Sequence, residues 1–392
     1  MPNESQAMFI KDMISKDHLQ FLLRHSLITV LAFALISFMA AIALNVSFLN
    51  PLSKAISDFN FTDVYYQILQ ESGDNEYNDD IVLVDLTPLQ NRQEIATALQ
   101  QIEEQHPKVI GVDCVFEGLK EDTLGDIMIS NVAAEYQNIV FSCKYLDYTN
   151  DSLGYTVAVR SFFAEPLEVE QGFTNMQYSL YGSMARLVSL GRKFNGELQP
   201  SFIARVVNYT LDKPLPIEDK DLRINFTPTI FTVIPPDSIS EYADKIKDKI
   251  VLLGTMTDEY DMHMTPMGKM PGVELLAYAG QTLQNRLEVG TFPVWLEIIV
   301  SFLMVLLTQI LLTKWGDYTS SRKNKYWRNT VSLVFVKTQL LMYWMIFLMY
   351  MSYLIFYLLR FDIGLGYAMS AMAFLTMATD FYTKAKNMLT ED

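Results

Sequence analysis

The sequence contains few of the residues, and none of the spaced motifs, that mark a catalytic centre. It has two cysteines and four histidines in 392 residues. It lacks a Gly-x-Ser-x-Gly nucleophile turn, a His-Glu-x-x-His zinc motif and a glycine-rich phosphate loop. These absences argue against an enzyme, and we expect neither a cofactor nor a resident metal ion.

The two cysteines, Cys114 and Cys143, each lie near the end of an apolar run rich in β-branched residues. An even pair in an oxidising compartment is compatible with one disulfide across neighbouring strands. Two separate buried thiols fit the sequence equally well. Neither cysteine has the spacing of a metal or redox motif.

Charged residues are almost missing from four apolar segments, each close to the ~20 residues that a helix needs to cross a bilayer. The last segment is followed by too few residues for a kinase or cyclase domain, so we expect any signal to leave through a separate protein. The expected parts are an N-terminal segment (1–25), a first span (26–48), a polar domain (49–291), a second span (292–312), a basic loop (313–339), a third span (340–359), a fourth span (363–381) and a short tail (382–392).

The basic loop sets the expected orientation. It carries Lys314, Arg322, Lys323, Lys325 and Arg328, which marks it as cytoplasmic because cytoplasmic loops are enriched in Lys and Arg. With four spans, both termini are then cytoplasmic, and residues 49–291 lie outside, in the periplasm of a bacterial inner-membrane protein.

The outside block has an excess of acid. Residues 51–288 hold 36 Asp and Glu against 18 Lys and Arg, in a chain whose net charge is −15. Such a surface repels nucleic acid and favours cations or basic partners, although solubility alone also explains it. We therefore expect no nucleic-acid partner.

Alternating strand and helix patterns predict an α/β domain with a mixed, largely parallel sheet. Residues 81–86 (IVLVDL), 108–116 (KVIGVDCVF) and 138–143 (NIVFSC) read as strands, with helical patterns at 92–105 and 124–137 between them. A second set of elements follows further along the chain. It comprises helices at 183–190, 200–211 and 273–285 and strands at 222–226 and 249–254. Gly172 suggests a turn that needs permissive backbone angles.

The best candidate site lies where the parallel strands end, since α/β sheets open ligand crevices at that edge. Asp85 and Asp113 close two strands, and the loop after the strand 249–254 supplies further donors. Carboxylates with one imidazole can bind a cation or exchange protons, but Asp at strand ends also caps turns. The candidate ligand-binding residues are Asp85, Asp113, Thr255, Asp258, Asp261, His263 and Thr265.

Several motifs together resemble the CHASE domain of the second type, a cyclase- and histidine-kinase-associated sensory extracellular domain. They are IVLVDL (81–86), KVIGVDCVF (108–116), GFTNM (172–176), INF (224–226), KIVLLGTMTDEYDMHMTP (249–266) and MPGVELLAYAGQTL (270–283). The resemblance implies an extracytoplasmic sensory domain with one helix before it and three after it, usually fused to an output domain. This chain resembles a stand-alone form without output domain. It departs from the family at 276–279 (LAYA), so no ligand contact is carried over there.

Two hypotheses follow. In the first, the chain is a sensor that detects an envelope ligand or partner and relays through its helices to a protein in trans. In the second, it is a scaffold subunit of an envelope complex without a small ligand. Both need the lipid bilayer. The resemblance implies a homo-oligomer, by default a dimer. A small-residue face on the fourth span permits it, although the same face also suits packing within one four-helix bundle. This face consists of Gly364, Gly366, Ala368, Ser370 and Ala371. Gln309, in the middle of the second span, should find a hydrogen-bond partner inside the bundle.

Overall fold

The computed structural model describes residues 16–45, 60–121, 123–178, 184–321, 323–324, 326, 329–330 and 334–390. The chain divides into two compact units. Residues 63–290 form one, called the globular unit, and residues 1–62 with 291–392 form the other, called the helical unit. The globular unit ends within one residue of the predicted polar domain (49–291) and begins later, at residue 63.

The centre of the globular unit is a largely parallel sheet, as the sequence predicts. Its strands lie in the order β11-β1-β12-β2-β3, with β5 also parallel to β3. Asp85 of β1 lies in register with Gly254 of β12, so these strands end at one edge. The strand bounds are β1 Glu76–Asp85, β2 Val109–Val112, β3 Ile139–Asn150, β5 Gln171–Phe173, β11 Thr229–Ile234 and β12 Ile250–Gly254.

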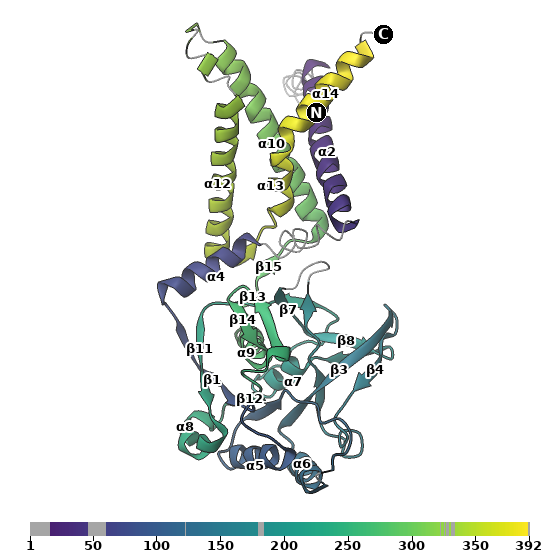
Figure 1. Ribbon diagram of the computed structural model, residues 1–392, viewed down its shortest axis with the longest axis vertical. Helices are drawn as coiled ribbons and strands as arrows, with labels where there is room; N and C mark the ends of the chain where they lie inside the picture. Colours follow the sequence, from purple (N-terminus) through teal and green to yellow (C-terminus); the bar gives the residue numbers. More distant parts are fainter. Residues whose placement is uncertain are drawn as a thin grey trace, which may run out of the picture. The chain divides into compact units, whose positions relative to one another are not determined.

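Helices cover both faces of this sheet (Figure 1). Val82 and Val84 point to the face covered by α5 and α6, whereas Ile81 lies beneath α9 on the other face. This alternation follows from the two-residue period of a strand, and both faces are apolar because both are buried. The helices are α5 Arg92–Glu103, α6 Thr123–Glu135, α7 Phe202–Asn208 and α9 Gly272–Asn285, with the short η2 Pro236–Tyr242 and α8 Ala243–Ile246.

The start of α5 shows how the sequence sets these boundaries. The Asn91 side chain accepts a hydrogen bond from the Glu94 backbone N–H (3.0 Å), and the Glu94 carboxylate accepts one from the Gln90 N–H (2.6 Å). This reciprocal arrangement caps the free amides of the first turn.

A smaller antiparallel lobe extends the sheet beyond β3. The second half of β3 pairs with β4, and β8 pairs with β9 and, at one position, with β4. Tyr145, Phe173 and Phe194 stack at its base. A separate sheet has the order β10-β7-β6. The bounds are β4 Gly154–Val159, β6 Gln177–Tyr178, β7 Ala185–Ser189, β8 Gly191–Phe194, β9 Glu197–Pro200 and β10 Asp221–Arg223.

One predicted element is wrong. Residues 183–190 were expected to be helical, but they contain β7, which pairs with β10 over Leu187, Val188 and Ser189. An apolar stretch this short fits a helix or a strand, and pairing with two neighbours decides between them. Residues 200–211 do contain a helix, α7, which begins behind the Ser201 cap.

Gly172 lies in β5 rather than in a turn, and its lack of a side chain lets α7 approach the sheet. A Cβ at this position would lie 2.3 Å from Phe202 Cα and 2.5 Å from Phe202 N, both backbone atoms. We therefore expect Gly172→Ala to destabilise the globular unit by about 1–3 kcal/mol, because β5 or α7 must shift. Thermal unfolding of the full chain would measure the loss. Gly316→Ala, where a Cβ meets nothing within 4 Å, is the control; equal melting of the two variants would contradict this packing.

The helical unit contains three helices long and apolar enough to cross a membrane among the described residues. They are His18–Met39 within α2 (Lys16–Asn45), Val294–Ser320, which is α10, and Thr338–Leu359 within α12 (Val334–Leu359). Residues 1–15 and 46–48 of the predicted N-terminal segment and first span lie outside the described residues. Helix α2 begins before the predicted start of the first span. Its His25 lies 3.1 Å from the Thr313 hydroxyl through Nε2.

The predicted fourth span, 363–381, is not confirmed as one helix. After the short strand β16 (Phe361–Asp362), the chain forms α13 (Gly366–Ala373) and α14 (Leu375–Thr390), which are separated at Phe374. The Phe374 N–H bonds back to Ala371, which closes the first helix before the second begins. Neither piece reaches the length of the three spanning helices.

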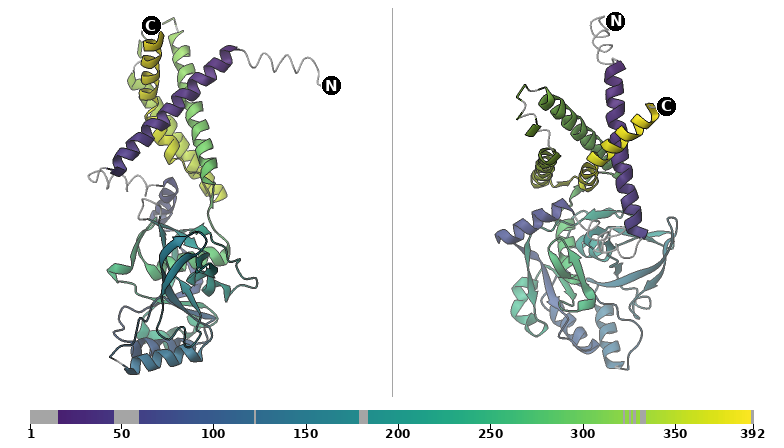
Figure 2. Two further views of the ribbon diagram at one scale, coloured as in Figure 1. Left: turned by 90° about the vertical axis from the view of Figure 1, so that its right-hand side faces the viewer. Right: turned by 45° about the horizontal axis from the view of Figure 1, so that its top comes forward.

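The predicted small-residue face packs inside the helical unit. Ala368 and Ala371 of α13 are fully buried with Ile28 and Ala32 of α2 and Val305 of α10. Helix α2 crosses α14 and also contacts α10 and α13 (Figure 2). Gln309 donates to the Thr379 hydroxyl (3.3 Å), so its predicted partner is found on α14.

Candidate functional site

The segment after β12 carries most of the predicted site residues and folds as a short turn, a hairpin and a helix. The 3₁₀ turn η3 (Glu259–Asp261) leads into the hairpin of β13 (Met262–Thr265) and β14 (Gly268–Pro271), and α9 begins directly after it. The hairpin pairs Met262 with Pro271, so the segment around residue 262 lies beside the start of α9.

Three of the predicted residues bind their own backbone surroundings. Asp85 accepts hydrogen bonds from the N–H groups of Thr87 (2.8 Å) and Met256 (3.2 Å), which fixes the loop after β1 to the loop after β12. Asp258 caps η3 by accepting from the Tyr260 N–H (3.0 Å). Thr265 is buried and donates to the Gly268 carbonyl across the hairpin turn (2.8 Å). For these residues the capping interpretation fits the contacts.

Asp113, Asp261 and His263 come together, and we call them the carboxylate–histidine cluster. Asp113 follows β2, and its backbone N–H donates to the Leu253 carbonyl (2.8 Å), which fixes it beside the end of β12. His263 Nε2 lies 3.6 Å from Asp261 Oδ1. All three side chains are partly buried. Thr255 follows β12 directly, and we assign it no role.

The charge of this cluster is poised near neutral pH. Burial, and after it the nearby Asp261 carboxylate, raise the pKa of Asp113 to about 7. Lys144, a hydrogen bond from Ser142, and His263 act in the opposite direction and lower it. Asp113 therefore gains or loses its proton near neutral pH.

Asp261 also contacts the start of α9. A Cβ at Gly272, the first residue of that helix, would lie 2.7 and 2.8 Å from the two Asp261 carboxylate oxygens. Only glycine admits the carboxylate so closely, and a negative charge is favourable at a helix N-terminus. The Pro271 N-cap provides no side-chain cap of its own. A change in the charge of the cluster would therefore act directly on the first turn of α9.

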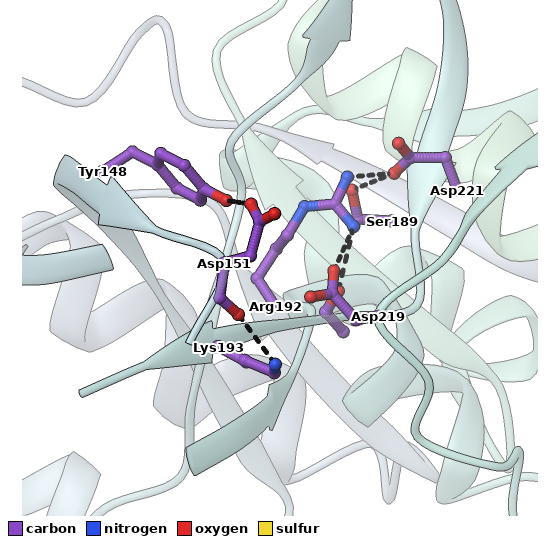
Figure 3. Close-up of polar contacts among 8 residues, drawn as sticks. Tyr148, Asp151, Ser189, Arg192, Lys193, Asp219 and Asp221 are labelled. Carbon is purple, nitrogen blue, oxygen red and sulfur yellow. Dashed lines mark hydrogen bonds and ion pairs between the residues drawn. The ribbon is translucent and has the colours of Figure 1, made fainter. Parts of the chain in front are cut away.

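A second group of polar residues lines a cavity of about 360 Å³ that the sequence interpretation missed (Figure 3). We call it the Arg192 cavity. Arg192 extends between two aspartates, 3.1 Å from Asp219 and in contact with Asp221. On the opposite wall, the Tyr148 hydroxyl bonds Asp151, and Lys193 Nζ donates to the Asp151 carbonyl (2.8 Å). The lining residues are Tyr148, Asp151, Gly154, Tyr155, Arg192, Lys193, Asp219 and Asp221.

The charged groups of the Arg192 cavity are largely paired with one another. The simplest interpretation is that they hold β4, β8 and the loop before β10 together. Its residues come from three separate segments and follow no spacing motif. The only sequence feature that points to this cavity is the adjacency of Arg192 and Lys193, and it is a weak one.

Both cysteines are free thiols in the structure, so no disulfide joins them. Burial raises the pKa of Cys114 to about 11 and that of Cys143 to about 11. Thiols with such pKa values carry little thiolate at neutral pH and react slowly. Within the described residues, no group of three or more His, Cys, Asp and Glu side chains is arranged to hold a metal ion.

Comparison with known proteins agrees with this architecture. A family model described as the CHASE2 domain matches residues 29–311, well over half of the chain. The chain belongs to the CHASE2 family. The CHASE2 match runs from within α2, through the whole globular unit, to within α10. No curated protein and no solved structure matches the chain significantly. The predicted resemblance is confirmed, and the globular unit is the family's extracellular sensory domain.

Proposed function

We propose that this CHASE2 protein is a membrane sensor without catalytic activity. Its globular unit detects a change in charge at the carboxylate–histidine cluster, and α9 passes that change to α10. A separate protein then reads the state of the membrane helices. The observation that carries the proposal is the contact of the Asp261 carboxylate with the first turn of α9.

The construction of α9 supports a relay. Nearly all of its residues from Gly272 to Leu283 are buried, so a displacement of the first turn moves the helix as a body rather than bending it. Residues 286–293 alone separate α9 from α10 in the chain. The short segment 286–293 therefore connects α9, which contacts the sensing cluster, to a membrane helix.

The charge pattern supports the placement in the cell. We place the basic loop 313–339 in the cytoplasm and the globular unit in the periplasm of a bacterium, with the helices in the inner membrane. Cytoplasmic location of both termini further requires that the chain cross the membrane once more through α13 and α14.

The proposed sensing is tested by changing the pH, with the proton as the probe. Hydrogen–deuterium exchange of the full chain in lipid nanodiscs would be compared at pH 6 and pH 8, corrected for the intrinsic pH dependence of exchange. We expect amides of β13, β14 and the first turn of α9 to exchange roughly fivefold more slowly at pH 6, a change of about 1 kcal/mol in local opening. Protonation of Asp113 removes its repulsion with Asp261 and so tightens this region.

Two variants sharpen that experiment. Asp261→Asn should abolish the pH response, because the carboxylate against α9 is lost. Asp258→Asn, which alters an exposed cap only three residues away, should retain it. A response that persists in Asp261→Asn, or that stops at the hairpin without reaching α9, would count against the proposed relay.

The scaffold hypothesis remains the second candidate because of one observation. Leu119, Leu124 and Ile127 are exposed near the start of α6 in the sequence, and a contiguous apolar patch would be typical of a protein contact. Gentle purification of the native complex with mass spectrometry separates the two functions. A cytoplasmic signalling protein among the captured chains favours the sensor, whereas envelope proteins lost in Leu124→Glu favour the scaffold.

A further inference from the structure

Helix α10 shows how a face of this helical unit that contacts lipid is built. Its exposed middle positions are all aliphatic, and its exposed aromatic residues lie toward the ends. Trp295 and Trp315 are 20 residues apart, or about 30 Å along the helix, which is the thickness of the hydrocarbon core. Tryptophans at both interfaces with aliphatic residues between them are typical of a lipid-facing helix. The exposed middle positions are Ile298, Ile299, Leu303, Leu307 and Leu311.

Helix α12 does not follow this pattern. Tyr343 and Tyr350 are 65% and 61% exposed, and Phe347 lies between them. Tyr350 lies within about 2 Å of the centre of the span Thr338–Leu359, and Tyr343 within about 8 Å. The backbone positions of both residues therefore lie inside a hydrocarbon core whose half-thickness is about 15 Å.

The tyrosine hydroxyls need partners that lipid cannot provide. Hydrocarbon offers no hydrogen-bond donor or acceptor, so a polar group at this depth must be satisfied by protein. Neither Tyr343 nor Tyr350 makes a hydrogen bond to any residue that the structure describes. On the opposite face of α12, by contrast, the Trp344 indole donates to the Thr308 hydroxyl (2.9 Å). The Trp344 indole thus has a partner within the chain, whereas the hydroxyls of Tyr343 and Tyr350 require a second chain.

The spacing of the outer face indicates how that chain packs. Tyr343, Tyr350 and the exposed Tyr357 recur every seven residues, with Ile346 exposed in between. A seven-residue repeat is the period of two helices packed side by side in a left-handed supercoil. A face that only contacts lipid has no need of this repeat.

A second copy of this chain fits the face best. Two copies inserted in the same membrane have the same orientation, so their α12 helices run parallel, and each position of the repeat meets its own counterpart. A phenol hydroxyl both donates and accepts, so two identical tyrosines across a two-fold axis satisfy each other. We propose that α12 is a dimerisation helix whose Tyr343, Phe347 and Tyr350 face pairs with the same face of a second copy. The inference uses the membrane placement proposed above and is independent of sensing.

Cysteine crosslinking of the full chain in its native membrane tests the proposal. Tyr350→Cys and Tyr343→Cys would be oxidised with copper phenanthroline and resolved without reducing agent. We expect a disulfide-linked dimer from each. Leu307→Cys, on the lipid-facing side of α10, is the matched control and should stay monomeric. The wild-type chain is the blank, because Cys143 is buried and Cys114 partly buried, both within the globular unit.

Equal crosslinking at 307 and 350 would indicate random collision and would overturn the interface. A disulfide between position 350 and a different protein, without a homodimer, would assign the face to another partner and overturn the second copy.

Removal of the hydroxyls tests their role without placing a polar group in the bilayer. The double variant Tyr343→Phe/Tyr350→Phe, reconstituted as the full chain, should dimerise about tenfold more weakly because interhelical hydrogen bonds are lost. Mass photometry at graded dilution would measure this. Dimerisation as tight as that of the wild type would overturn the hydrogen-bonded interface. A pH response of α9 that survives in this variant would leave the sensing proposal standing, so the two can fail separately.

Discussion

Replacement of Asp63 by alanine is expected to destabilise the globular unit by about 3–5 kcal/mol. Arg186 donates to both Asp63 oxygens, through Nε at 3.1 Å and through its terminal nitrogen, and both side chains are about 11% exposed. The substitution leaves the guanidinium buried without its counter-charge. Thermal unfolding of the full chain in detergent should show a fall of about 10 °C in Tm.

Two further variants show whether buried charge is the cause. Asp79→Ala breaks an exposed pair with Lys245 and should cost less than about 1 kcal/mol. Asp63→Ala/Arg186→Met removes both charges and should recover much of the lost stability. A single variant Asp63→Ala as stable as Asp79→Ala would show that the buried pair contributes little.

The position of this pair extends its effect beyond stability. Asp63 lies in the first turn of α4 (Phe61–Ser72), and Arg186 lies in β7, so the pair fixes α4 to the β10-β7-β6 sheet. Next to β7, Met184 forms a bridge to Met264 of the hairpin that carries His263. Loosening α4 in Asp63→Ala should therefore also loosen the hairpin of the proposed sensing cluster.

The parallel core of the fold could be predicted because its signal is local. Runs such as 81–86 and 249–254 are apolar on both faces. This pattern is expected when helices cover both sides of a parallel sheet. Parallel strands end at the same edge of a sheet, and Asp85 and Gly254 lie in register at that edge. Which acids meet at that edge could not be predicted, because Asp85 turns to backbone amides whereas Asp261 is carried to α9 by the β13–β14 hairpin.

The misjudged elements share a different cause. The helix expected at 183–190 became β7 because its pairing partners lie far away in the sequence, at 177–178 and 221–223. The segment 363–381 has the composition of one span, and no proline marks the break at Phe374. The Arg192 cavity needs β4, β8 and residues 219–221 together, which no single stretch of sequence encodes.

Asp113→Asn is expected to stabilise the globular unit in a way that grows with pH. The folded-state pKa of Asp113, about 7, is above its unfolded value near 4. Below pH 4 both states hold the proton, and Asp113 has no effect on the pH dependence. Between pH 4 and pH 7 the unfolded chain ionises first, so the wild type loses stability as pH rises, and above pH 7 the loss is complete. The variant has no such charge, and its advantage should widen by about 2–4 kcal/mol from pH 4 to pH 8.

Chemical denaturation of the full chain at pH 5, 6.5 and 8 would measure this widening, with Asp258→Asn as the control that should follow the wild type. A constant difference between Asp113→Asn and wild type at all three pH values would contradict a folded-state pKa of about 7 for Asp113. The same variant also shows whether the charge of Asp113 only destabilises the fold or also controls α9. The amide that Asp113→Asn introduces is neutral, like the protonated carboxyl of Asp113. If the cluster controls α9, the variant at pH 8 should therefore show the slow amide exchange of the wild type at pH 6. If the variant gains stability but amide exchange in α9 is unchanged, the charge of Asp113 destabilises the fold without affecting the helix.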